Sequence, residues 1–211
     1  MNINKYLVEL IGTFFLVLTI GCTVLKPNDA GPIAPLAIGS VLMVMIFAGG
    51  HISGAHYNPA VTLAVCLRGK CPMSDVPGYM VAQVAGAILA ALAVLFFKGK
   101  QPAPTPQADI LQALLAEVLF TFALCYVVLN VATAKGTSGN SFYGLAIGFT
   151  VLAGAFAVGP ISGGVFNPAV AVGLTVMGAK AVGDIWIFLL ANFAAGAAAA
   201  FTFKFLNPQD K

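Results

Sequence analysis

The sequence is poor in charge. Only 8% of its 211 residues are Asp, Glu, Lys or Arg, whereas a soluble domain carries about 25%. Two stretches, Ala30–Leu67 and Gly136–Ala179, contain none of these residues, and each is longer than the roughly 20 residues of one membrane span. Because these few charged residues cannot cover a water-facing surface, we expect an integral membrane protein whose main partner is the lipid bilayer.

Cysteine and histidine are also scarce, which argues against several kinds of site. The four cysteines have no metal-ligand spacing, and we interpret them as reduced, apolar packing residues. No nucleophile–base pair and no basic run is present, so we predict no enzyme activity, no cofactor, no metal and no nucleic-acid partner. The only histidines, His51 and His56, are expected in a pore-lining loop. Loop packing is the preferred role for them, and a pH gate is the alternative.

The apolar residues group into six predicted spans. A polar, proline-rich segment, Lys98–Asp109, follows the third span and cannot continue a helix. We therefore divide the single domain 1–211 into two halves, about 1–97 and 108–211, with residues 98–107 as a linker. The predicted spans are Lys5–Leu25, Ile33–His51, Val76–Phe97, Ala108–Val131, Ser141–Gly159 and Gly183–Phe205.

The two halves repeat each other. Each contains a Glu-x-x-x-Thr-x-x-Leu motif, an Asn-Pro-Ala box and an aspartate before its last span. Each half has three spans, an odd number, so the halves have opposite orientations in the membrane. The matched pairs are Glu9 with Glu117 (117 − 9 = 108), Asn58 with Asn167 (167 − 58 = 109) and Asp75 with Asp184 (184 − 75 = 109).

Each Asn-Pro-Ala box predicts a helix start at mid-membrane. Asparagine is a good helix cap, and proline is favoured at the first helical position. The boxes are Asn58-Pro59-Ala60, beginning a helix to Leu67, and Asn167-Pro168-Ala169, beginning one to about Val176. Eight to ten residues rise roughly 12–15 Å, about half of the hydrocarbon thickness. We expect the glycine-rich segments before the boxes, "AGGHISGAHY" and "VGPISGGVF", to be extended and to line a water-filled path.

Inverted halves bring the two short helices together, N-terminus to N-terminus. Their positive dipole ends and the amides of Asn58 and Asn167 then meet at one point. A neutral molecule with a lone pair can accept hydrogen bonds there, whereas a cation loses hydration and meets two positive ends. The sequence therefore predicts a passive channel for water and other small neutral solutes.

At these residues the sequence resembles the aquaporin and glycerol-facilitator family, the major intrinsic proteins. The resemblance covers nearly the whole chain and rests on the paired boxes, on "GHISGAHYNPAVT" and on the two glutamate motifs. It implies an all-α membrane protein of six spans and two re-entrant half-helices, with one pore per subunit of a homotetramer. It also implies that Glu9 and Glu117 are buried and brace the re-entrant loops, a role that we prefer to proton transfer.

One position departs from the family pattern. Where the resemblance implies an arginine, three residues after the second asparagine, the chain has Val170. Matching the family's other filter positions by distance from the asparagines implies Ile38, Ala155 and Gly164, with Gly163 beside them in the pore-lining loop. This set is small and apolar, so we expect a wide filter with few side-chain donors and with one electrostatic barrier to cations missing.

Three other functions remain open. An aquaglyceroporin-type channel would conduct mainly glycerol, urea or ammonia. A proton-coupled carrier would use Glu9 or Glu117, and a junction protein would conduct negligibly. A slight excess of positive residues on one side predicts cytoplasmic N- and C-termini in a plasma (inner) membrane.

Overall fold

The computed structural model describes residues 3–210 and contains eight α-helices there; Met1, Asn2 and Lys211, the ends of the predicted domain, lie outside the described residues. Six helices are long and apolar enough to cross a membrane, and two have nine residues each. The predicted fold class, six spans plus two half-helices, is therefore confirmed. The long helices are α1 (Ile3–Val24), α2 (Ala34–Ser53), α4 (Val76–Lys98), α5 (Ile110–Val128), α6 (Tyr143–Ser162) and α8 (Ile185–Leu206), and the short ones are α3 (Pro59–Leu67) and α7 (Pro168–Val176).

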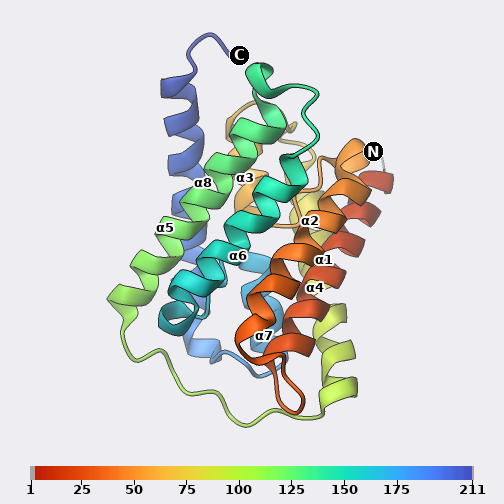
Figure 1. The fold of residues 1–211 in the computed structure, drawn as a ribbon, viewed down its shortest axis with the longest axis vertical. Coiled ribbons are helices and arrows are strands. Elements are labelled where there is room, and N and C mark those ends of the chain that lie inside the picture. The colour runs from red at the N-terminus through yellow and green to blue at the C-terminus, as the bar shows by residue number, and fades with distance from the viewer. Residues whose placement is uncertain (1–2, 211) are drawn as a thin grey trace.

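The helices pack as two interlocked halves. Helix α1 packs on α4 and α5 packs on α8, while α2 and α6 meet across the boundary between the halves. Each half-helix crosses that boundary too, since α3 packs on α8 and α7 packs on α4. Figure 1 shows α3 at one end of the bundle and α7 at the other. The two short helices therefore approach the centre from opposite ends.

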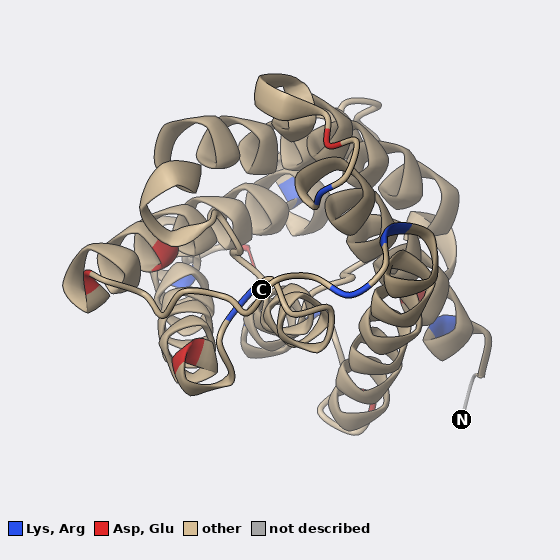
Figure 2. Cartoon of the chain, turned by 90° about the horizontal axis from the view of Figure 1, so that it is seen from below, with Lys and Arg blue, Asp and Glu red and all other residues tan. Residues whose placement is uncertain are grey.

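Small residues allow these close crossings. Ala199 and Ala200 are fully buried on α8, and the carbonyl oxygen of Ala60 lies 2.7 Å from the point where a Cβ on Gly196 would be. Small residues of this kind let helix backbones approach within a membrane. Large apolar side chains such as Phe96 and Phe205 are instead exposed on the outside. Viewed along the bundle in Figure 2, the helices encircle the centre and nearly all of the ribbon is uncharged.

The predicted extended segments are shorter than expected. Helix α2 continues through Ser53 and α6 through Ser162, so that only residues 54–57 and 163–166 are non-helical before the boxes. Both helices end at a left-handed glycine, Gly54 (φ 86°) and Gly163 (φ 94°), whose N–H groups bond to carbonyls four residues back. The predicted extended segments begin at Ala48 and Val158, but these residues, like Pro160, lie within the helices. A helix tolerates glycine and proline in a membrane, where neighbouring helices support it.

The other boundaries differ from the prediction by a few residues. Helix α1 begins at Ile3, α5 begins at Ile110, and α6 extends three residues beyond Gly159. A π-helical turn, Leu129–Thr133, prolongs α5, and a 3₁₀ turn, Val182–Asp184, precedes α8. The connection between α4 and α5, residues 99–109, runs across one end of the bundle. Both chain termini lie at the other end (Figure 1).

Candidate functional site

The asparagine of each box fixes the start of its half-helix. Asn58 and Asn167 have nearly identical extended backbones, with φ −158° in both and ψ 120° and 117°. Each side-chain oxygen accepts the N–H two residues ahead, from Ala60 and from Ala169, at 2.9 Å. The proline between them has no N–H to leave unsatisfied. The local sequence thus sets both the helix start and the direction of the asparagine side chain.

The same asparagines also link the two halves of the chain. Nδ2 of Asn58 donates to the carbonyl of Phe166 at 2.9 Å, and Nδ2 of Asn167 donates to the carbonyl of Tyr57 at 2.8 Å. A carboxamide has two N–H donors, so each amide keeps one for another acceptor. The structure has two main cavities, and both asparagines line the larger one. The meeting point of the two half-helices therefore offers one free N–H group from each asparagine. The sequence predicted that the complete side-chain amides would be available there.

Glu9 holds the loop that precedes α3. Its side chain is fully buried, and four donors reach its two carboxylate oxygens. Oε1 accepts the hydroxyl of Ser53 at 2.7 Å and the N–H of His56 at 2.9 Å. Oε2 accepts the N–H of Tyr57 at 2.6 Å and an amide N–H of Gln83 at 2.8 Å. These bonds compensate for removing a carboxylate from water.

Glu117 holds the loop that precedes α7 in the same way. It too is fully buried. Oε1 accepts the Ser162 hydroxyl at 2.7 Å and the Val165 N–H at 2.9 Å, and Oε2 accepts the Phe166 N–H at 2.7 Å. Tyr57 and Phe166, the last loop residues, have φ angles of 50° and 49°. The carboxylates therefore stabilise loops whose backbone conformation is unfavourable for bulky residues.

The larger cavity has a volume of about 600 Å³ and mostly apolar walls. It runs from the two asparagines toward the end of the bundle that carries the α4–α5 connection. A Cβ added at Gly164 would lie 3.3 Å from Cα of Ala155, so these two walls are close to each other. The structure brings all four predicted filter residues into this lining, together with Gly163: Ile38, Ala155, Gly164 and Val170.

Several residues of the predicted site do not line this cavity. Pro59, Ala60, Pro168 and Ala169 are buried within the half-helices, behind the asparagines. His51 does not lie in a pore-lining loop as predicted. It lies in the last turn of α2, is exposed and borders neither of the two main cavities. The reason is that α2 does not end at the glycines before His51.

His56, in contrast, lies between two cavities. A second cavity of about 370 Å³ opens at the opposite end of the bundle, and His56 and Val128 belong to the walls of both. Nδ1 of His56 is 3.1 Å from the Thr62 hydroxyl, and its ring lies 5.0 Å from that of Tyr79. His56 therefore lies where the walls of the two cavities meet.

Lys180, which belongs to no recognisable motif of the sequence, also lines the larger cavity. Its Nζ donates to the Ser162 carbonyl at 2.8 Å and lies 5.3 Å from the ring centroid of Phe188. Partial burial lowers the pKa of Lys180, while the carboxylates of Glu117 and Asp184 act in the opposite direction. Its place, four residues after the end of α7, gives no motif by which the sequence alone could have revealed it.

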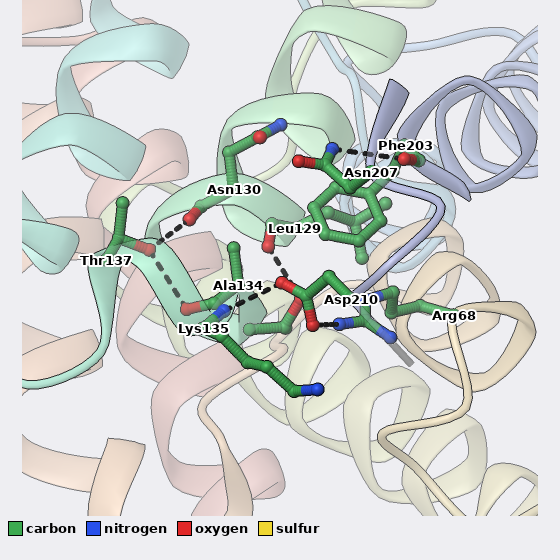
Figure 3. Close-up of polar contacts among 10 residues, drawn as sticks. Arg68, Leu129, Asn130, Ala134, Lys135, Thr137, Phe203, Asn207 and Asp210 are labelled. Carbon is green, nitrogen blue, oxygen red and sulfur yellow. Dashed lines mark hydrogen bonds and ion pairs between the residues drawn. The ribbon is translucent and has the colours of Figure 1, made fainter. Parts of the chain in front are cut away.

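A polar cluster fastens the segment after α8 to the far end of α3 (Figure 3). Nη2 of Arg68, at the C-cap of α3, lies 2.6 Å from Oδ1 of Asp210, and the Lys135 N–H donates to Oδ2 at 2.7 Å. The Arg68 guanidinium also lies 4.5 Å from the ring centroid of Phe203. A cation at a helix C-terminus is favourable, so this cluster stabilises the outer end of α3.

Among residues 3–210 no group of three or more His, Cys, Asp or Glu side chains is placed to hold a metal ion. The four cysteines are free thiols. The polar groups of the site are instead amide N–H groups, carbonyl oxygens and one ammonium. Such groups bind and orient neutral hydrogen-bonding molecules without any covalent chemistry.

Comparison with known proteins agrees with this geometry. The family described as "Major intrinsic protein" matches residues 2–203. The chain is 36% identical over 218 residues to the probable aquaporin NIP4-2 of Arabidopsis thaliana, covering 99% of this chain and 76% of that protein. It is 36% identical over 219 residues to nodulin-26 of Glycine max, covering 99% and 80%.

A solved structure has the same fold. The X-ray structure of the aquaglyceroporin from Plasmodium falciparum superposes with a TM-score of 0.83 and covers 99% of this chain and 98% of that one. The two sequences are only 20% identical. This likeness therefore establishes the architecture of six spans and two half-helices, and says nothing by itself about the solute.

Proposed function

Since the chain belongs to the major intrinsic protein family, whose members are channels and not enzymes, we propose that it is a passive pore with a wide, apolar filter. One observation carries this proposal. The asparagines at the N-termini of both half-helices line the same cavity as the four apolar filter residues. A solute that passes the filter therefore reaches two convergent N–H donors. The chain is an integral, multi-pass membrane protein.

The filter composition supports permeation by solutes larger than water. Val170 stands where the family usually has arginine, and Ala155 and Gly164 add little bulk. Pore diameter and the donors that line it determine which neutral molecules pass. We therefore propose that water permeates together with a small polyol or amide such as glycerol or urea. A pore mainly for glycerol, urea or ammonia is the second candidate, and the same filter residues favour it.

A proton-coupled carrier is less well supported. Each oxygen of Glu9 and Glu117 accepts at least one hydrogen bond from a loop N–H, and together they hold both re-entrant loops. Protonation would remove an acceptor from these donors. We expect the solute flux to be independent of an imposed pH gradient, and flux that follows the gradient would support the carrier instead.

The assembly and the orientation are also part of the proposal. The channel is a homotetramer with one pore per subunit and lies in the plasma (inner) membrane. Its N- and C-termini are cytoplasmic, which agrees with their position at one end of the bundle and with the excess of positive residues there.

Stopped-flow light scattering on proteoliposomes tests the filter. We expect the intact protein to conduct water and glycerol, and Val170→Arg to lower glycerol flux by about tenfold or more, since arginine both narrows and charges the pore. Val176→Arg is the matched control, because Val176 is exposed at the far end of α7 and lies outside the cavity lining. Equal glycerol impermeability of the intact protein and Val170→Arg would contradict the proposal.

A further inference from the structure

The wall of the larger cavity carries a positive charge in spite of the missing arginine. Lys180 follows α7 after four residues and turns back toward the loop that contains Gly163 and Gly164. We propose that Lys180 supplies the fixed charge of the filter and determines its selectivity against cations. This inference rests on the proposed channel function but adds a residue to it.

The position of the ammonium is fixed by close contacts. Nζ of Lys180 donates to the Ser162 carbonyl at 2.8 Å. A Cβ added to Gly163 would lie 2.7 Å from that Nζ and 2.9 Å from Cε, so the end of the lysine side chain occupies the space beside Gly163. The φ of 94° at Gly163 also favours glycine. The ammonium group is thereby held beside Gly163, the residue that precedes the filter residue Gly164.

No carboxylate neutralises Lys180 at contact distance. The ion pairs between described residues 3–210 are Lys5–Asp75, Lys26–Asp29 and Arg68–Asp210. The nearest acidic groups are Asp184, which accepts the Gln107 N–H at 2.7 Å, and Glu117, whose oxygens accept the loop donors. Among residues 3–210, Lys180 is therefore the one lysine or arginine in the cavity lining, and no ion pair at contact distance holds it.

The remaining N–H groups of Lys180 suit neutral solutes. An ammonium has three donors, and one is used by the Ser162 carbonyl. The other two can donate to the hydroxyl or carbonyl oxygen of a polyol, urea or water. Sodium, ammonium or hydronium ions meet a like charge at short range within apolar walls, where screening by water is weak.

This arrangement separates two properties that a filter arginine combines. An arginine at position 170 would fill the cavity with a long side chain and charge it at the same time. Lys180 instead donates to the loop carbonyl of Ser162, and Ala155 and Val170 remain in the cavity lining. The pore can then admit larger neutral molecules while it still rejects cations, so the electrostatic barrier that the sequence analysis found missing is restored.

The test compares proton leak with water flux in proteoliposomes of Lys180→Met, Lys180→Gln and Lys180→Arg. A pH-sensitive dye trapped inside reports the leak under a potassium diffusion potential set by valinomycin. We expect Met and Gln to raise the leak by roughly tenfold or more, and Arg to retain the low leak of the intact protein. Lys100→Met is the control, because Lys100 is exposed in the α4–α5 connection and outside the cavity lining.

Each outcome decides the question. Glutamine keeps a hydrogen-bond donor for the Ser162 carbonyl but has no charge. A raised proton leak in Lys180→Gln with retained water flux therefore supports the proposed role of the Lys180 charge. Introducing Val170→Arg into Lys180→Met should restore the low leak. A leak that stays low in Met and Gln while water flux persists overturns the inference. Absence of water flux in the intact protein would instead overturn the proposed channel function.

Discussion

Replacing Glu117 by glutamine tests whether the carboxylate braces the re-entrant loop. The remaining oxygen can serve the Ser162 hydroxyl and the Val165 N–H, whereas the new amide NH2 faces the Phe166 N–H, which is now 2.7 Å from an oxygen. A buried donor without an acceptor costs about 1–3 kcal/mol. A protein of this size loses about 2–4 °C in melting temperature per kcal/mol, so we expect a fall of about 2–12 °C.

Glu117→Ala is the stronger form of this perturbation. It leaves three donors unsatisfied, and the same reasoning gives an upper bound of about 9 kcal/mol, because additivity fails for neighbouring groups. Fluorescence-detected size-exclusion chromatography after stepwise heating measures both variants. Asp109→Asn is the control, because it also removes one carboxylate but keeps the N-cap of α5, where Asn and Asp are equivalent. Melting curves of Glu117→Gln that coincide with this control would refute the bracing role.

The corresponding variant in the first half provides an internal comparison. Gln83 donates to Glu9, and its own amide oxygen is buried without a partner. In Glu9→Gln the Gln83 amide can rotate so that its oxygen accepts from the new NH2 group; the Thr62 hydroxyl, to which Gln83 Nε2 now donates at 2.9 Å, can then donate to the same oxygen. At the equivalent position of the second half is Asn192, whose oxygen already accepts from the Thr121 hydroxyl. Glu9→Gln should therefore lower the melting temperature less than Glu117→Gln does.

Two further predictions concern the end of the bundle where the termini lie. The Lys135 N–H and the Arg68 guanidinium lower the pKa of Asp210, so the stability that it contributes is fully present above the ordinary carboxyl pKa near 4 and is lost as the pH falls through the lowered value. The difference in melting temperature between the intact protein and Asp210→Asn should thus be constant from about pH 7 to 5 and shrink as the pH falls below about 4; a difference that does not shrink there would contradict the ion pair (Figure 3). Burial raises the pKa of the Cys71 thiol to about 11, which leaves roughly one thiolate in 10,000 at pH 7. Maleimide should therefore label the partly exposed Cys66 long before Cys71, as peptide mass spectrometry can check, and labelling at equal rates would contradict this assignment.

Much of the fold could be predicted because it follows from local physical requirements. Charge-free segments of sufficient length must form helices in lipid, and a capping asparagine followed by proline fixes where each half-helix begins. The ends of α2 and α6 could not be predicted in the same way. Gly49 and Gly159 are compatible with either a helix or a loop, and packing against neighbouring helices decides between them. His51 was placed in the pore-lining loop for this reason.

The filter shows the same limit more clearly. Counting from Asn167 finds residues that the half-helix itself positions, such as Val170, because three residues on a helix have a fixed geometry. It cannot find Lys180, because the chain leaves α7 after Val176 and only the folded structure brings the lysine side chain beside Gly163. A missing charge in a motif is therefore weak evidence for a missing charge in the pore. We infer that the local sequence determines the width of this filter, and that its charge comes from a residue that only the tertiary fold brings near.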